Sequence, residues 1–202
     1  MNSPTNAASH PVPLSALPPD DALREELHNE VHARPSARIR LPALIVFVAV
    51  LNEGVSREQA LDCLAANLRK SAEAFAALGI RVLVEAINPI DMPGFLINTP
   101  EDLDALLRAV DHPNLAAQYD LYHMARQGID VAAGMRLLAG RIGHVQFADV
   151  PGRGAPGTGE LAFPALLGAL RDSGYSGWLG AEYKPGEAGT QASLGWLQAF
   201  RA

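Results

Sequence analysis

The sequence predicts an α/β protein with a parallel sheet, arranged as part of a (β/α) barrel. Short apolar, β-branched runs alternate with amphipathic patterns of roughly 8 to 15 residues, which is typical of βα units. Each of four strand-like runs ends in a carboxylate or an amide side chain. A doubly wound open sheet predicts the same alternation, so the position of these polar residues is what favours the barrel.

The N-terminal part of the chain shows this alternation only weakly. Residues 1–19 are rich in Pro, Ser, Asn and Ala and lack periodicity, which predicts a flexible leader. Residues 20–54 form a second segment, with a short helical pattern at residues 22–32 and an apolar run at residues 43–50 that predicts a buried strand. Residues 55–202 are expected to form the main α/β unit.

The segment after residue 55 carries the clear pattern. Ser56 and Gln59 have the spacing of a capping box at the start of a helix, and Gly79 is expected at its C′ position. The apolar face of this helix comprises Leu61, Leu64, Leu68, Ala72 and Phe75. The strands are expected at Ile80–Glu85, Leu115–Asp120, Ile142–Phe147 and Trp178–Glu182. Further helices are expected at Pro100–Val110 with Thr99 as N-cap, Val131–Leu138, Phe163–Asp172 and Ala192–Ala199.

The polar residues at the strand ends are Glu85, Asp120, Gln146 and Glu182. They are 35, 26 and 36 residues apart, against an average of about 31 for the eight units of a barrel of about 250 residues. Parallel strands present their carboxyl ends at one edge, so the four side chains should converge. Three carboxylates and an amide form a ligand set for Mg²⁺ or Mn²⁺. Any one of them alone is better interpreted as a solvated turn residue, whereas the four together at this spacing favour a metal site.

Three further residues are candidates for substrate contact near this mouth. His123 follows Asp120 by three residues and is expected on a loop. Arg153 lies in the Gly/Pro-rich stretch PGRGAPGTGE, and Lys184 follows Glu182 by two residues.

Composition excludes several functional classes. Twenty-two acidic residues against sixteen basic ones give a formal charge of −6, which argues against binding to nucleic acid or to an anionic membrane surface. The single Cys63 cannot form an internal disulfide and indicates a reducing, cytoplasmic location. The longest apolar run, residues 41–51, is shorter than the roughly 20 residues that span a bilayer.

Residues from about 55 to 198 resemble the C-terminal half of hydroxypyruvate isomerases, members of the xylose isomerase-like TIM-barrel superfamily. The stretches that carry the resemblance are GVSREQAL, GIRVLVEAIN, DMPGFLINT, QYDLYHM, GHVQFADVPGRGAPGTGE and GYSGWLGAEYKP. The resemblance implies that Glu85, Asp120, Gln146 and Glu182 hold a divalent metal and that the two glutamates move a proton. It also implies isomerisation of hydroxypyruvate and tartronate semialdehyde. For this small hydroxy-carbonyl acid, we expect His123 to hydrogen-bond a substrate oxygen and Arg153 or Lys184 to pair with the carboxylate.

Residues from about 18 to 58 resemble instead the N-terminus of an uncharacterised bacterial family of predicted membrane-anchored proteins. We therefore expect a fusion, truncated relative to the isomerases, whose partial barrel corresponds to about strands 4 to 8. Such a sheet would have two open edges. An alternative function follows, namely a non-catalytic metal-binding half-barrel that assembles with a second copy or a partner.

Overall fold

The computed structural model describes residues 43–46, 51, 53–187 and 189–197. These residues belong to one compact unit, Leu41–Ala202. The leader expected at residues 1–19 and the helix expected at residues 22–32 lie outside the described residues.

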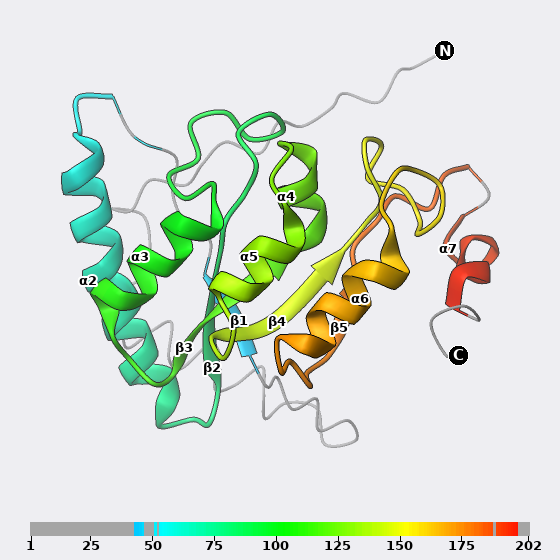
Figure 1. The fold of residues 1–202 in the computed structure, drawn as a ribbon. Helices are drawn as coiled ribbons and strands as arrows, with labels where there is room; N and C mark the ends of the chain where they lie inside the picture. Colours follow the sequence, from blue (N-terminus) through cyan, green and yellow to red (C-terminus); the bar gives the residue numbers. More distant parts are fainter. Residues whose placement is uncertain (1–42, 47–50, 52, 188, 198–202) are drawn as a thin grey trace, which may run out of the picture. The chain divides into compact units, whose positions relative to one another are not determined.

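A five-stranded parallel sheet forms the centre of this unit (Figure 1). Its strands are β1 Ala43–Val46, β2 Arg81–Glu85, β3 Leu115–Asp120, β4 Ile142–Phe147 and β5 Leu179–Ala181. Each strand pairs in parallel with the next one along the chain, in the order β1-β2-β3-β4-β5. Strands of a (β/α) barrel follow one another in this sequential order, whereas the order of a doubly wound sheet reverses. The expected strands are confirmed, with β5 shorter than predicted.

Four helices lie side by side over one face of the sheet (Figure 1). They are α2 Arg57–Ala76, α3 Pro100–Val110, α5 Val131–Leu137 and α6 Phe163–Asp172, close to their predicted bounds. The C-terminal pattern, predicted as one helix, forms α7 Gly189–Ala192 followed by the 3₁₀-helix η2 Ser193–Trp196. One short helix, α4 Leu121–Arg126, is not predicted from the sequence. It has only six residues, which is too few for a helical hydrophobic period to be recognised.

The predicted helix starts are borne out in detail. Ser56 accepts a hydrogen bond from the backbone N–H of Gln59, whose side chain accepts from the N–H of Ser56. Thr99 and Asp102 make the same reciprocal pair at α3. Each such cap satisfies backbone donors that the first helical turn leaves unpaired. The N-terminal ends of both helices are therefore held in place by side-chain hydrogen bonds.

The hydrophobic core lies between the helices and the sheet. Alternate strand residues point into it, including Val82 and Val84 of β2 and Ala117 and Tyr119 of β3. Because side chains of a strand alternate between faces, Glu85 and Asp120 point to the opposite face. The polar residues at the strand ends are thus held on the face away from the helices.

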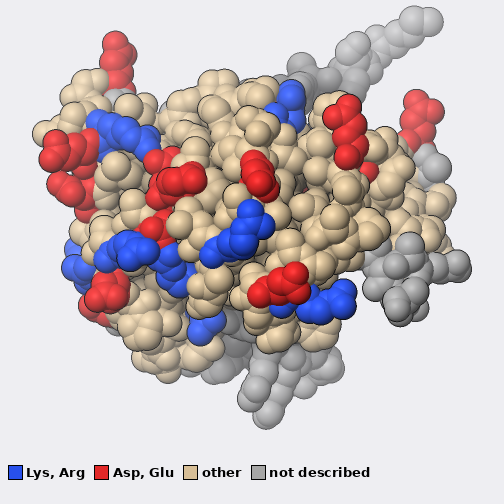
Figure 2. All heavy atoms as spheres, viewed as in Figure 1, with Lys and Arg blue, Asp and Glu red and all other residues tan. Residues whose placement is uncertain are grey.

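Figure 2 shows basic and acidic side chains interspersed over the helical face. Ion pairs among the described residues include Arg57 with Asp102 at 2.9 Å and Arg108 with Asp104 at 2.8 Å. Mixed charges of this kind produce no broad positive field on the face that is seen. None of the helices in the described ranges has the length and apolar character needed to cross a membrane.

Candidate functional site

The four predicted polar residues lie at one edge of the sheet. Glu85 and Asp120 are the last residues of β2 and β3, Gln146 is the penultimate residue of β4, and Glu182 directly follows β5. Since the strands are parallel, these positions share the carboxyl edge. The register is staggered, because Asp120 pairs with Gln146 whereas Glu85 pairs with Gln118.

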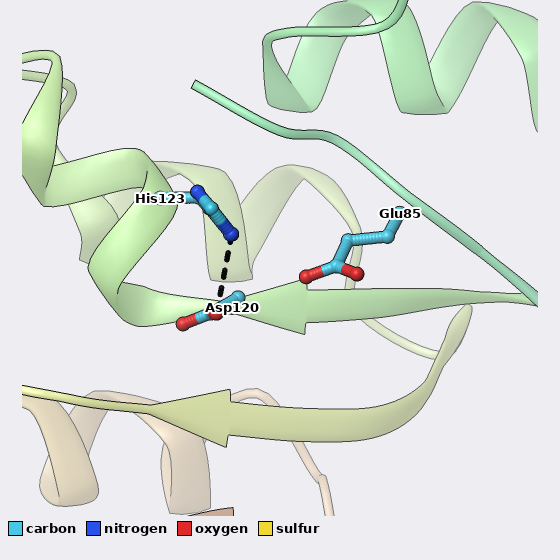
Figure 3. A group of neighbouring side chains, drawn as sticks. All are labelled: Glu85, Asp120 and His123. Atoms are coloured by element: carbon cyan, nitrogen blue, oxygen red, sulfur yellow. Dashed lines mark ion pairs between the residues drawn. The ribbon is translucent and has the colours of Figure 1, made fainter. Parts of the chain in front are cut away.

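Glu85, Asp120 and His123 form a close group at this edge (Figure 3). Each offers one ligand atom, and these atoms lie within 4.8 Å of one another. All three side chains are buried. Three groups that bind cations or protons are therefore brought together by β2, β3 and α4 in a site screened from water.

Gln118 connects two of the predicted residues. Its Nε2 donates to Glu85 Oε2 at 2.9 Å and to Gln146 Oε1 at 2.5 Å. It lies two residues before Asp120 and therefore on the same face of β3. Sequence reasoning missed this buried amide, although the alternation of the strand was a signal that could have found it.

Three buried oxygen atoms at this edge have no hydrogen-bond partner, namely Glu85 Oε1, Gln118 Oε1 and Asp120 Oδ2. Buried polar atoms are nearly always hydrogen-bonded, so such a cluster of acceptors without hydrogen bonds calls for a positively charged or protonated partner. Oxygen atoms without a thiolate are the donors that hard divalent cations prefer. The residues present therefore fit a divalent metal.

Burial and mutual repulsion control the charge of this group. Burial raises the pKa of Glu85 to about 8, and the negative charges of Asp120 and Glu182 add to the rise. Burial likewise raises the pKa of Asp120 to about 6, although the N–H of Tyr122 and the guanidinium of Arg153 act in the opposite direction. Without a cation, the two carboxylates thus tend to take up protons near neutral pH.

Glu182 lies in a different environment from Glu85. Its side chain is 54% exposed and pairs with Arg153 Nη2 at 2.8 Å. The same nitrogen lies 3.7 Å from Asp120 Oδ2, and the guanidinium stacks over the ring of Tyr122 at 5.0 Å. Arg153 therefore links the exposed glutamate to the buried group.

His123 is not on a loop, as the sequence predicted, but on the helix α4. Asp120 is the N-cap of this helix and accepts from the N–H of Tyr122, so β3 passes directly into α4. The Nε2 of His123 lies 3.6 Å from Asp120 Oδ2. Burial, together with the charge of Arg153, lowers the pKa of His123 to about 4, so the imidazole is neutral at pH 7.

The Gly/Pro-rich loop that carries Arg153 is organised by the buried residue Asp149. Its two carboxylate oxygens accept from the backbone N–H groups of Val150, Gly157, Gly159 and Leu161, at 2.9 to 3.0 Å. Lys184 contacts the same loop through its backbone, since its N–H donates to the carbonyl of Arg153 at 2.7 Å. The Lys184 side chain itself is exposed.

Two other residues of the site were missed, and for different reasons. Asp149 lies two residues after the end of β4 and three residues after Gln146, so it carried the same strand-end signal as the four predicted residues. Asn88, which contacts His123, lies in the segment between β2 and α3, where no periodicity marks it. Its role depends on a contact between segments 35 residues apart.

Comparison with known proteins identifies a family. The family described as Xylose isomerase-like TIM barrel matches residues 6–200. A 2-oxo-tetronate isomerase of Cupriavidus necator is 44% identical over 66% of this chain and 51% of its own length. A hydroxypyruvate isomerase of Escherichia coli is 40% identical over 73% of this chain and 57% of its own. The chain thus spans about half the length of these two curated relatives.

Other matches extend over more of the chain. A 2-oxo-tetronate isomerase of Pectobacterium atrosepticum is 32% identical over 97% of this chain and 74% of its own length. A solved structure described as an AP endonuclease, family 2, from Brucella melitensis has a TM-score of 0.78 and 33% identity, covering 90% of this chain and 67% of that one. These matches include the residues expected to have a separate, membrane-anchored origin, so the comparisons give that expectation and the fusion no support.

Proposed function

This chain belongs to the xylose isomerase-like TIM barrel family, and we propose that it isomerises a small hydroxy-carbonyl acid of the hydroxypyruvate type. The substrate pair is hydroxypyruvate and tartronate semialdehyde, with the one-carbon-longer 2-oxo-tetronate class as the nearest relative in chemistry. One observation carries the proposal, namely that the buried carboxylates of Glu85 and Asp120 each have an oxygen without a hydrogen bond at the carboxyl edge of the sheet. Catalytic sites of (β/α) barrels are built at this edge.

The proposed metal ligands are Glu85, Asp120, Gln146 and Glu182, and the proposed metal is Mg²⁺ or Mn²⁺. A divalent cation held there supplies a positive charge that polarises a carbonyl and stabilises negative charge on neighbouring oxygens. Its charge also opposes the repulsion that raises the pKa of Glu85 and Asp120.

The reaction moves two protons and needs no oxidant. One proton leaves the hydroxyl-bearing carbon and is delivered to the neighbouring carbonyl carbon, while the hydroxyl proton passes to the former carbonyl oxygen. We assign the carbon-to-carbon transfer to Glu85 and Glu182, one as the base and the other as the acid. His123, neutral and beside Asp120, is placed to hydrogen-bond a substrate oxygen.

Arg153 and Lys184 are proposed to bind the substrate's carboxylate. Arg153 already contacts the carboxylate of Glu182 and lies 3.7 Å from Asp120, so its guanidinium reaches the rim of the site. A planar guanidinium can bind a carboxylate through two parallel hydrogen bonds. Lys184 is exposed near the same loop and contributes a second, more mobile positive charge.

The test is an isomerase assay on the purified chain with added Mg²⁺ or Mn²⁺. We expect interconversion of hydroxypyruvate and tartronate semialdehyde, with Glu182→Gln inactive and the matched surface change Glu73→Gln on α2 fully active. The proposal is lost if the chain binds metal but converts neither hydroxypyruvate nor 2-oxo-tetronate.

A second candidate is a metal-binding module without turnover that assembles with another copy or a partner. It is favoured by the sheet, since in the described part of the chain β1 pairs only with β2 and β5 only with β4. Sizing chromatography with metal titration separates the two candidates. An inactive, metal-binding dimer supports the module, whereas an active monomer removes the reason for it.

A further inference from the structure

His123 is held between two groups with opposite hydrogen-bonding demands. Its Nε2 faces Asp120 Oδ2, an acceptor, at 3.6 Å. Its Nδ1 faces the side-chain Nδ2 of Asn88 at 2.7 Å and the backbone N–H of the same residue at 3.4 Å. A neutral imidazole carries its proton on one nitrogen only, so these neighbours determine which one.

The orientation of the Asn88 amide is determined by Asp91. The N–H of Asp91 donates to Asn88 Oδ1 at 2.8 Å, and Asn88 Nδ2 donates to Asp91 Oδ2 at 3.1 Å. Exchanging the oxygen and nitrogen of this amide would face a donor with a donor and an acceptor with an acceptor. Nδ2 therefore points at His123, with one hydrogen for each of its two acceptors.

Asp91 is itself held in place. Its Oδ2 accepts from the hydroxyl of Tyr122 at 2.6 Å, and Arg126 Nε lies 3.5 Å from its Oδ1. Tyr122 and Arg126 both belong to α4, the helix that carries His123. The segment after β2 and the helix after β3 are thus joined by one continuous set of hydrogen bonds around Asn88, which is completely buried.

We propose that Asn88 is a positioning residue that fixes His123 as the tautomer with its proton on Nε2. Because Nδ1 receives two N–H donors, it must present a lone pair, and the Nε2–H then points toward Asp120 and the substrate edge. In this state Nε2 has no lone pair for a metal, although its position beside Glu85 and Asp120 suits a ligand. His123 is a hydrogen-bond donor to the substrate, and the cation is held by oxygen atoms. The substrate part of this assignment rests on the proposed function, whereas the tautomer does not.

The experiment is nitrogen NMR of the imidazole rings in the ¹⁵N-labelled chain at neutral pH, with and without Mg²⁺. Signals of His123 are assigned by their loss in His123→Gln. His112 is an internal reference, because the N–H of Asn114 donates to its Nδ1 at 3.1 Å. We expect His123 with a bare Nδ1 and a protonated Nε2, unchanged when Mg²⁺ is added. A protonated Nδ1 in the unmodified chain, or an Nε2 that loses its proton when Mg²⁺ binds, overturns the inference.

The variant Asn88→Asp sharpens the test, because it replaces the donor by an acceptor of the same shape. Nδ1 should gain a proton, and kcat/KM should fall about tenfold to a hundredfold, the usual cost of disturbing a group that orients a functional side chain. Asn67→Asp, the same change on the exposed surface of α2, should alter neither the His123 signals nor the activity. A bare Nδ1 in folded Asn88→Asp would contradict the role of Asn88. An inactive parent chain with the expected tautomer would refute the proposed function and leave this inference intact.

Discussion

The two halves of the candidate site differ in how much water reaches them. The half formed by β2, β3 and α4 is buried, with Glu85, Asp120 and His123 each less than a tenth exposed. The half formed by β5 and the loop after β4 is open, with Glu182 54% exposed and Lys184 on the surface. Desolvation moves the pKa values of the buried half, so its proton and metal chemistry is set by the fold, whereas the open half can rearrange around a substrate.

The largest expected effect comes from replacing a glutamate in either half. Glu85→Gln and Glu182→Gln should each lower kcat by about 10²- to 10⁴-fold, since each removes a group that we propose transfers a proton. Steady-state kinetics with Mn²⁺ measures this, and Glu73→Gln is the surface control. If only the buried glutamate mattered, with Glu182→Gln near full activity, the open half would have no part in proton transfer.

The next effect distinguishes the halves by metal binding. Mn²⁺ at a hundredfold excess over its dissociation constant should stabilise the fold by about 2.7 kcal/mol and raise the melting temperature. Asp120→Asn, or the double change Glu85→Gln with Glu182→Gln, should remove this response. Lys184→Ala should keep it. A thermal melt that is identical with Mn²⁺ and with chelator would show that these oxygens do not bind the ion.

A smaller effect is expected in the pH dependence of the metal-free chain. Glu85 and Asp120 bind protons more tightly when folded, so their protonation favours the folded state. This stabilisation is complete below the ordinary pKa values of 4.5 and 3.8, and it is lost as the pH rises to about 8 for Glu85 and about 6 for Asp120.

Urea unfolding across this pH range should therefore show a falling free energy of unfolding, and saturating Mg²⁺ should flatten the fall. Asp120→Asn should reduce the slope in the metal-free chain, because it removes one titrating group and its repulsion of Glu85. A metal-free chain whose stability rises from pH 5 to pH 8 would contradict the buried environment of these carboxyls.

The smallest effects should come from the substrate contacts of the open half. Arg153→Lys keeps the charge and loses the fork of two hydrogen bonds, so KM for hydroxypyruvate should rise about tenfold while kcat changes little. Lys184→Ala should change KM by only a few-fold, because an exposed ammonium gains little from ion pairing. If Lys184→Ala raised KM more than Arg153→Lys, the assignment of the main carboxylate contact would have to be reversed.

The sequence predicted the features that a pattern of nearby residues determines. It did not predict the short helix α4 or the contacts between segments that are distant along the chain. The strand ends at Glu85 and Asp120, the capping box at Ser56 and the N-cap at Thr99 follow from residues a few positions apart. The helical position of His123 was missed, because α4 is short and starts without a loop. Gln118 was readable from strand alternation, whereas the pairing of Asn88 with His123 joins two segments whose proximity only the folded sheet establishes.

The shape of the loop that carries Arg153 depends largely on contacts with one residue, Asp149. Its carboxylate accepts hydrogen bonds from four backbone N–H groups among the twelve residues that follow it. Most of the contacts that shape the loop are therefore made within the loop itself. We therefore expect this loop to keep much of its shape if it is moved to another barrel together with Asp149. The loop should therefore tolerate insertions poorly, because an extra residue between Val150 and Leu161 would move backbone N–H groups away from the Asp149 carboxylate. We then expect differences in substrate preference to arise from changes in the side chains of this loop and not from changes in its length.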